Sequence, residues 1–196
     1  YAWWSVLVKI VVTVVVVVTV AHIVNAGVAL SQADYNRRND RTDIVYDQNM
    51  VHMKLGGKSF AEMGCGAAAT HNAIILAGGS SSLADVVEFM QAHDLTLGII
   101  GVYFTNIQLY LKRKGYLSKL HIMNLKNNID KKIKSCERKI AILLYKQTKL
   151  YHYVAIMYNN QEKKFYVYNT DTGLRKKSVD KWIKKYSYTP RCLITI

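Results

Sequence analysis

Hydrophobic and polar positions divide the chain into an apolar N-terminal segment, a helix-patterned middle and a strand-patterned end. From Trp3 to Leu30 the only ionisable side chains are Lys9 and His22. Only two threonines interrupt the valine-rich run between positions 12 and 20, and no polar face follows a helical period, which argues against an ordinary core helix. A segment of this length and composition predicts a membrane-spanning helix or a signal segment.

Two interpretations of this segment remain open. As an anchor, it has Trp3 and Trp4 for one membrane interface and a basic group beyond the other, so the positive-inside tendency places the globular part in the cytoplasm. As a signal peptide, it has Lys9 as the charged flank and cleavage sites near Ala26 or Ala33, which would yield a secreted protein. We favour the anchor, and therefore expect a single-pass protein of the cell membrane.

Polar residues of both charge signs fill positions 34–43 without periodicity, as is typical of a linker. We therefore divide the chain into a hydrophobic anchor or signal segment at 1–33, a polar linker at 34–43 and a folded domain at 44–196. The domain contains a single proline and no internal repeat, so we treat it as one unit.

The folded domain is patterned as helices first and strands afterwards. Helices are predicted at 64–76, 82–92 and 102–114, with a short solvated helix within 124–139. β-branched and aromatic runs then predict strands at 140–145, 151–158, 164–168 and 192–196, the second and third joined as a hairpin through Asn159-Asn160. Helices followed by an antiparallel sheet indicate the α+β class.

Three residues in this pattern have the chemistry of a thiol-dependent site. Cys65 begins a predicted helix between two glycines, where the helix N-terminus favours the thiolate. His152 opens one strand of the predicted hairpin and suits a general base, and Asn169 closes the other strand. The hairpin brings His152 and Asn169 to the same end, where the amide can accept from one ring nitrogen and fix the histidine tautomer.

This order of residues resembles the papain-like cysteine peptidases that process double-glycine bacteriocin leaders, together with their stand-alone relatives. The resemblance covers about residues 50–172 and rests on Gly64-Cys65-Gly66-Ala67-Ala68, followed by His152 and Asn169. It implies a papain-like fold, with N-terminal helices packed on the antiparallel sheet. It also implies a cofactor-free hydrolase that acts on a peptide or protein through a Cys65 acyl-enzyme, and a transporter on a separate chain as a further partner.

One position departs from that family, whose members usually carry a glutamine about six residues before the cysteine as an oxyanion-hole donor. Ser59 stands there in this chain and is therefore the candidate donor. Loss of one such donor typically costs on the order of 100- to 1000-fold in rate. The alternative function is accordingly a catalytically weak or inactive papain-like domain that binds peptides or anionic polymers at the membrane. A cell-wall amidase would use the same nucleophile and base, so peptidase and amidase both remain open.

Basic residues outnumber acidic ones by 27 to 13, a net charge of +14, and lysines gather within 126–139 and 175–185. Charge of this sign attracts anionic lipid, nucleic acid or acidic peptides. In a tethered protein it can simply hold the domain against the bilayer, so we do not expect nucleic acid as the partner. The three cysteines match no zinc motif and no phosphate-binding loop is present, so we expect neither a metal nor another cofactor.

Overall fold

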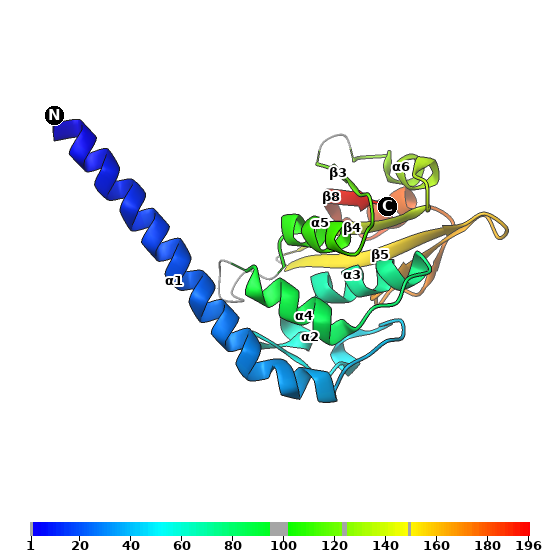
Figure 1. Ribbon diagram of the computed structural model, residues 1–196. Helices are drawn as coiled ribbons and strands as arrows, with labels where there is room; N and C mark the ends of the chain where they lie inside the picture. The colour runs from blue at the N-terminus through cyan, green and yellow to red at the C-terminus, as the bar shows by residue number, and fades with distance from the viewer. Residues whose placement is uncertain (1, 95–101, 123–124, 149) are drawn as a thin grey trace.

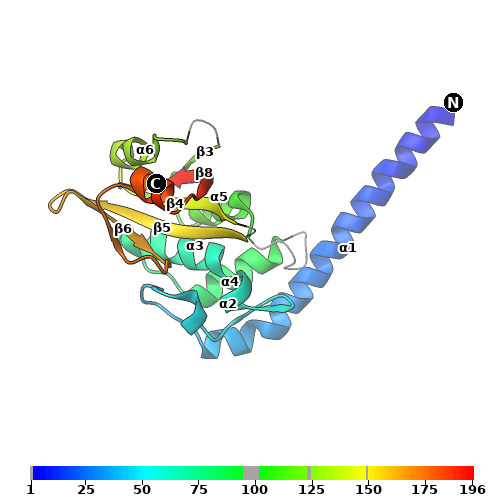
Figure 2. The ribbon, with the colours of Figure 1, turned by 180° about the vertical axis from the view of Figure 1, so that it is seen from behind.

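The computed structural model describes residues 2–94, 102–122, 125–148 and 150–196, and combines helices with antiparallel sheets (Figures 1 and 2). The helices are α1 (Ala2–Arg38), α2 (Phe60–Met63), α3 (Cys65–Leu76), α4 (Leu83–Ala92), α5 (Phe104–Arg113), α6 (Ile129–Ser135) and α7 (Val179–Lys185), with a 3-10 turn η1 (Gln48–Met50). The strands are β1 (Lys54–Leu55), β2 (Lys58–Ser59), β3 (Lys119–His121), β4 (Ile140–Gln147), β5 (Leu150–Asn159), β6 (Lys164–Tyr168), β7 (Arg175–Lys176) and β8 (Thr189–Thr195).

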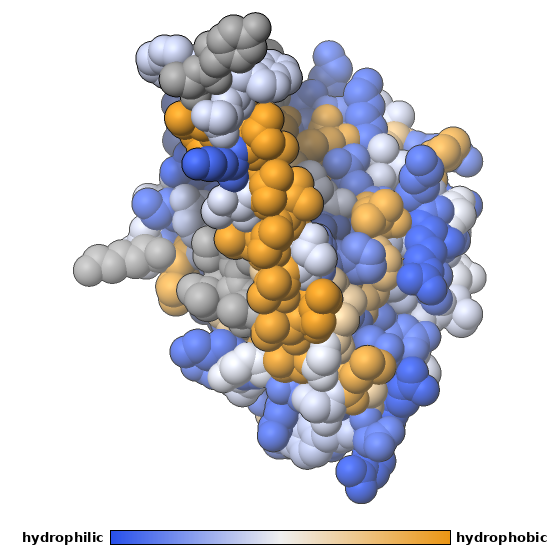
Figure 3. Space-filling model, turned by 60° about the vertical axis from the view of Figure 1, so that its left-hand side comes forward, coloured by the Kyte–Doolittle hydropathy of each residue, from blue (hydrophilic) through white to orange (hydrophobic). Residues whose placement is uncertain are grey.

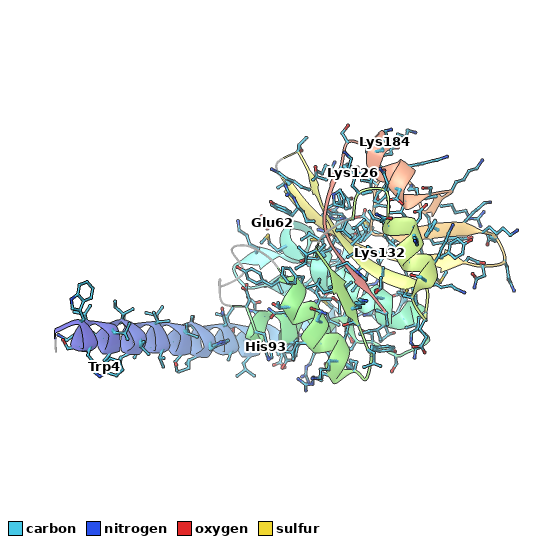
Figure 4. All side chains as sticks on the ribbon, turned by 90° about the horizontal axis from the view of Figure 1, so that it is seen from above. Trp4, Glu62, His93, Lys126, Lys132 and Lys184 are labelled. Atoms are coloured by element: carbon cyan, nitrogen blue, oxygen red, sulfur yellow. The ribbon has the colours of Figure 1, made fainter. Side chains whose placement is uncertain are left out.

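The N-terminal half of α1 projects away from the domain (Figure 1). Side chains from position 3 to 20 are exposed, and the helix is long and apolar enough to cross a membrane. About 20 helical residues span the ~30 Å hydrocarbon core, so the projecting part alone has sufficient length. Its apolar side chains form a continuous column (Figure 3), and Trp4 lies near the free end (Figure 4). The helix therefore fits either an anchor or a signal sequence.

The C-terminal half of α1 packs against the domain. Asn25, Ala29 and Asn36 are buried there. Asn36 donates to the Lys54 carbonyl at 3.0 Å and accepts from the Lys54 amide at 2.8 Å. Arg37 forms an ion pair with Glu88 of α4 at 3.2 Å. Residues 34–38 thus differ from the expected linker: they remain helical because their polar side chains find partners in β1 and α4.

The larger sheet of the described residues has the order β3-β8-β4-β5-β6-β7, with antiparallel pairing throughout. Along β4, alternate side chains enter opposite cores: Ile140 and Ile142 face the α3 side, whereas Ala141, Leu143 and Tyr145 face the α6 and α7 side. Both faces are covered by helices, which explains why β4 is apolar at almost every position (Figures 1 and 2).

The coarse fold prediction, helices combined with an antiparallel sheet behind an N-terminal apolar helix, is confirmed; the papain-like assignment stays a prediction. Ser82 caps α4 as expected, its hydroxyl accepting from the Asp85 amide at 3.1 Å. Helix α7 was not predicted from the sequence, because its lysines dominate a short segment. Its buried residues Val179, Trp182 and Ile183 nevertheless have the i, i+3, i+4 spacing of one helix face.

Candidate functional site

Helix α3 brings Cys65, its first residue, against strand β5. Ala67, Ala68 and Ala69 are fully buried and small enough for the helix to approach the sheet closely. Gly66 has no room for a side chain, because a Cβ there would lie 2.6 Å from the Cβ of Val102. Small residues after the cysteine are therefore required by the packing, and they place the thiol beside the backbone of Tyr153.

The surroundings of the Cys65 thiol act in opposite directions on its pKa. Burial raises the pKa and is the stronger effect, while the backbone amides of Tyr153, Gly66 and Cys65 itself favour the thiolate. The resting thiol is therefore protonated at neutral pH. Within the described residues Cys65 makes no hydrogen bond to His152.

His152 is the third residue of β5, which begins one residue earlier than the strand predicted at 151–158, and it pairs with Tyr145 on β4. Strand β6 pairs with β5 only from Ala155 onwards, so His152 lies past the end of β6. There its Nε2 lies 2.7 Å from the backbone carbonyl oxygen of Asn169. Burial lowers the pKa of His152, and the Asn169 carbonyl and the charge of Asp171 partly oppose that shift.

The Asn169 carbonyl fixes the tautomer of His152. A carbonyl oxygen only accepts, so Nε2 must carry the ring proton of the neutral imidazole, and Nδ1 is left as the basic nitrogen. Nδ1 makes no hydrogen bond to any described residue. The predicted pairing of His152 with Asn169 thus occurs, but through the backbone carbonyl and not through the side-chain amide.

The side chain of Asn169 holds Gln48 instead. Its Oδ1 accepts from the Gln48 backbone amide at 3.0 Å, and its Nδ2 donates to Gln48 Oε1 at 2.9 Å. Asn169 has φ = 64°, in the left-handed region that asparagine tolerates better than most residues. This conformation lets one residue present its carbonyl to His152 and its amide to Gln48.

Gln48 is a site residue that the sequence reasoning missed. Its Nε2 donates to the Ala61 carbonyl at 2.6 Å, which leaves a second amide hydrogen for another acceptor. It lies 17 positions before Cys65, and the β1–β2 hairpin between them brings it back to the site. A usable signal was present, since Gln48 is the only glutamine between position 33 and Cys65.

Ser59, the predicted oxyanion donor, lies elsewhere. Its hydroxyl donates to Glu62 Oε2 at 2.8 Å and its amide donates to the same oxygen at 3.0 Å, within the capping box that starts α2. Ser59 is exposed and does not line the cleft that contains His152. The structure therefore gives Ser59 a helix-capping role.

His152 and Asn169 line a cleft of about 280 Å³ together with Gln48 and Tyr145. Asp47 and Asp171 also line it, and no lysine or arginine does so among the described residues. Cys65 is not among the residues that line the cleft. The Tyr145 ring stands edge-on to the His152 ring at a centroid distance of 5.7 Å. Tyr145 packs in the core on the α6 and α7 side of the sheet, whereas Cys65 packs against the core on the α3 side.

No protein-family model matches the chain, and no curated protein matches it. The described residues also contain no group of three or more His, Cys, Asp or Glu side chains that could hold a metal ion.

Proposed function

We propose that the chain is a membrane-associated thiol peptidase of papain-like type, in which Cys65 is the nucleophile and His152 the general base. The observation that carries the proposal is the hydrogen bond from His152 Nε2 to the Asn169 carbonyl. This hydrogen bond leaves Nδ1 of His152 unprotonated at the open end of the β5–β6 hairpin. The next residue along β5, Tyr153, has the backbone amide that faces Cys65.

The reaction divides into acylation and hydrolysis. The Cys65 proton passes to His152 Nδ1 as the sulfur attacks the peptide carbonyl, and the tetrahedral intermediate collapses when His152 returns that proton to the leaving amine. Water, deprotonated by the same nitrogen, then cleaves the thioester and releases Cys65. The Asn169 carbonyl stabilises the imidazolium formed in each half, because it accepts the Nε2 proton throughout.

Two groups support an oxyanion hole in this proposal. The amides at the start of α3 already face the sulfur, and they carry the partial positive charge of the helix N-terminus. The second hydrogen on Gln48 Nε2 supplies a side-chain donor, held in place by Ala61 and Asn169. Gln48 therefore replaces Ser59 in the mechanism as the oxyanion donor.

The second candidate function is a peptide-binding domain without turnover. It is favoured by the absence of Cys65 from the residues that line the cleft and by the neutral resting state that burial imposes on both Cys65 and His152. In the peptidase, a peptide in the cleft must reach Cys65, which does not line the cleft. In the binding domain, the cleft would hold a peptide without contact to the thiol.

The proposal is tested with the full chain in a mild detergent and a peptide library read by mass spectrometry. We expect wild-type protein to cleave a subset of peptides, Cys65→Ala and His152→Ala to cleave none, and the control Cys136→Ala to keep wild-type activity. Cleavage that survives in Cys65→Ala would refute the assignment. Peptides retained but left intact by wild type would favour the binding domain.

The membrane arrangement is part of the proposal. We infer that α1 is retained as a single-pass anchor with the domain on the cytoplasmic side, because the basic Arg37 and Arg38 end the helix beside the domain. Protease protection of sealed vesicles tests the side. Loss of the segment before Ala26 or Ala33 from the mature protein would support the secreted alternative.

A further inference from the structure

A second concave surface lies beside the cleft, between β7 and α7. Its volume is about 430 Å³, and it is lined by Trp182 and five cationic residues: Arg175, Lys176, Lys177, Lys181 and Lys185. We call this surface the basic groove. No carboxylate is among its described lining residues, whereas the neighbouring cleft is lined by two aspartates. The two surfaces therefore have opposite charge.

The cations of the basic groove form no salt bridge with a described carboxylate. The ion pairs of the described residues involve Arg37, Arg41 and Lys58, all outside the groove. Lys176 Nζ donates to the backbone carbonyls of Thr172 and Gly173. Its pKa is lowered by burial and then by the charge of Lys185, while the charge of Asp171 acts in the opposite direction. Like charges held together in this way repel each other, and a bound anion would relieve that repulsion.

The basic groove and the cleft share a wall. Trp182 Nε1 donates to Thr172 Oγ1 at 2.8 Å, and Thr172 Oγ1 lies 3.0 Å from Thr170 Oγ1, which lines the cleft. On the other side, the Trp182 ring stands edge-on to Tyr145 at a centroid distance of 5.5 Å. Tyr145 in turn contacts His152. The cleft and the basic groove are therefore adjacent surfaces, linked through Thr170 and Thr172.

We propose that the basic groove binds an acidic segment of the peptide whose scissile bond lies in the cleft. The inference rests on the proposed peptidase function and specifies its substrate class: peptides with aspartate or glutamate residues to one side of the cleavage site. The aspartates of the cleft disfavour acidic residues at the cleavage site itself, so the two surfaces together fix how the peptide lies. Lys184, also on α7, lies across the domain from His93, where α4 ends close to α1 (Figure 4).

Binding is measured separately from cleavage, with the full-length Cys65→Ala chain in a neutral detergent. The probe is a fluorescent peptide with a glutamate run, compared with the same peptide carrying glutamines, and anisotropy gives the affinity at several salt concentrations. The groove variant is Lys181→Ser/Lys185→Ser. The control variant Lys112→Ser/Lys119→Ser removes the same charge from exposed positions on α5 and β3.

We expect the groove variant to bind the glutamate peptide about tenfold more weakly than the parent protein, because two ion pairs are lost and each exposed pair contributes a few-fold at most. The control variant should lose less than about twofold in affinity, because long-range charge is screened. The glutamine peptide should bind weakly to all of them. Equal losses in the two variants would overturn the proposal, since net charge alone would then explain binding. Groove-dependent binding of anionic lipid vesicles or single-stranded nucleic acid, without binding of the glutamate peptide, would also overturn it.

The failure of this inference is distinguishable from the failure of the peptidase function. If the glutamate peptide binds the groove and wild-type protein cuts no peptide of the library, the peptidase proposal fails and the groove assignment stands. If wild-type protein cuts library peptides without preference for acidic residues, and the groove variant cuts equally well, the groove assignment fails and the peptidase stands.

Discussion

Replacing Asn169 separates its two structural roles, the backbone contact to His152 and the side-chain contacts to Gln48. Asn169→Gly keeps the left-handed backbone, which glycine adopts without strain, and therefore keeps the carbonyl that accepts from His152 Nε2. It removes both side-chain hydrogen bonds to Gln48. Asn169→Ala removes the same bonds and additionally places a Cβ residue at φ = 64°.

The magnitudes follow from these contacts. A buried polar group left without its partner costs about 1–3 kcal/mol, and two such groups on Gln48 lose theirs. Water from the adjacent cleft can solvate them, so we expect Asn169→Gly to lose about 2 kcal/mol of unfolding free energy. Asn169→Ala adds about 1–2 kcal/mol of backbone strain to the folded state. Alanine also makes the unfolded chain less flexible than glycine does, which offsets part of this strain, so the net further loss of unfolding free energy is about 1 kcal/mol.

The assay is pulse proteolysis of the full chain across a urea series in mild detergent. With a urea slope of about 2 kcal/mol/M, the midpoint should fall by about 1 M in Asn169→Gly and by about 0.5 M more in Asn169→Ala. An alanine variant as stable as the glycine variant would refute the reasoning from backbone conformation.

The same variants test how His152 is oriented. Histidine ring ¹⁵N chemical shifts should show the Nε2-protonated tautomer in wild type and in Asn169→Gly alike. Peptide cleavage by folded Asn169→Gly should fall by no more than the about 100- to 1000-fold expected for losing the Gln48 donor, because Gln48 loses its Asn169 support, whereas loss of tautomer control costs on the order of 10⁴-fold in a comparable triad. A folded glycine variant that has lost the Nε2-protonated tautomer would mean that the side chain orients the histidine.

Three further predictions concern the packing around the site. Gly66→Ala should destabilise the protein by about 1–3 kcal/mol because its methyl group would meet Val102, whereas Gly57→Ala, with open space around it, should change little on that account; urea midpoints compare them. Burial lowers the pKa of His71 in the folded state. Its contribution to the free energy of unfolding is therefore fully present above the unfolded-state pKa of about 6.5 and is lost as the pH falls. A His71→Gln variant that remains folded should show a weaker acid dependence of the melting temperature. Asn36→Ala should increase hydrogen exchange in β1, which loses both bonds to α1, and unchanged exchange would count against docking of α1 there.

Element types were readable from the sequence wherever one periodicity was strong. Helices α3 and α4 and strands β4, β5 and β6 occur close to their predicted positions, because their composition and caps agree with their tertiary environment. The same reasoning failed at residues 34–38, whose polar side chains indicated a linker. Asn36 and Arg37 are polar because they bind the domain, and a pattern of polar residues alone does not distinguish docking from solvation.

The candidate site was predictable only in its residue types. A cysteine at a helix start and a histidine on a strand are local features, and a hairpin fixes which strand ends meet. The left-handed conformation of Asn169 is not local, since it is supported by Gln48, 121 residues earlier in the chain. Without the Gln48 contact, the side-chain amide of Asn169 is the expected partner for the histidine. Because Gln48 already occupies that amide, the backbone carbonyl of Asn169 accepts from His152 instead.

The exchange of roles between the Asn169 side chain and its carbonyl also explains how Gln48 enters the site. An oxyanion donor must be held before substrate arrives, and a long glutamine side chain on a short 3-10 turn would otherwise lose conformational entropy on binding. Ala61 and Asn169 bind the two ends of its amide, so that entropy is lost on folding.

Gln48→Ala should therefore reduce the rate of peptide cleavage by about 100- to 1000-fold while the His152 tautomer stays unchanged in the ¹⁵N spectrum. Ser59→Ala, which removes the capping hydroxyl outside the cleft, is the matched control and should affect stability but not turnover. Equal rates in wild type and Gln48→Ala would return the donor role to the amides of α3 alone.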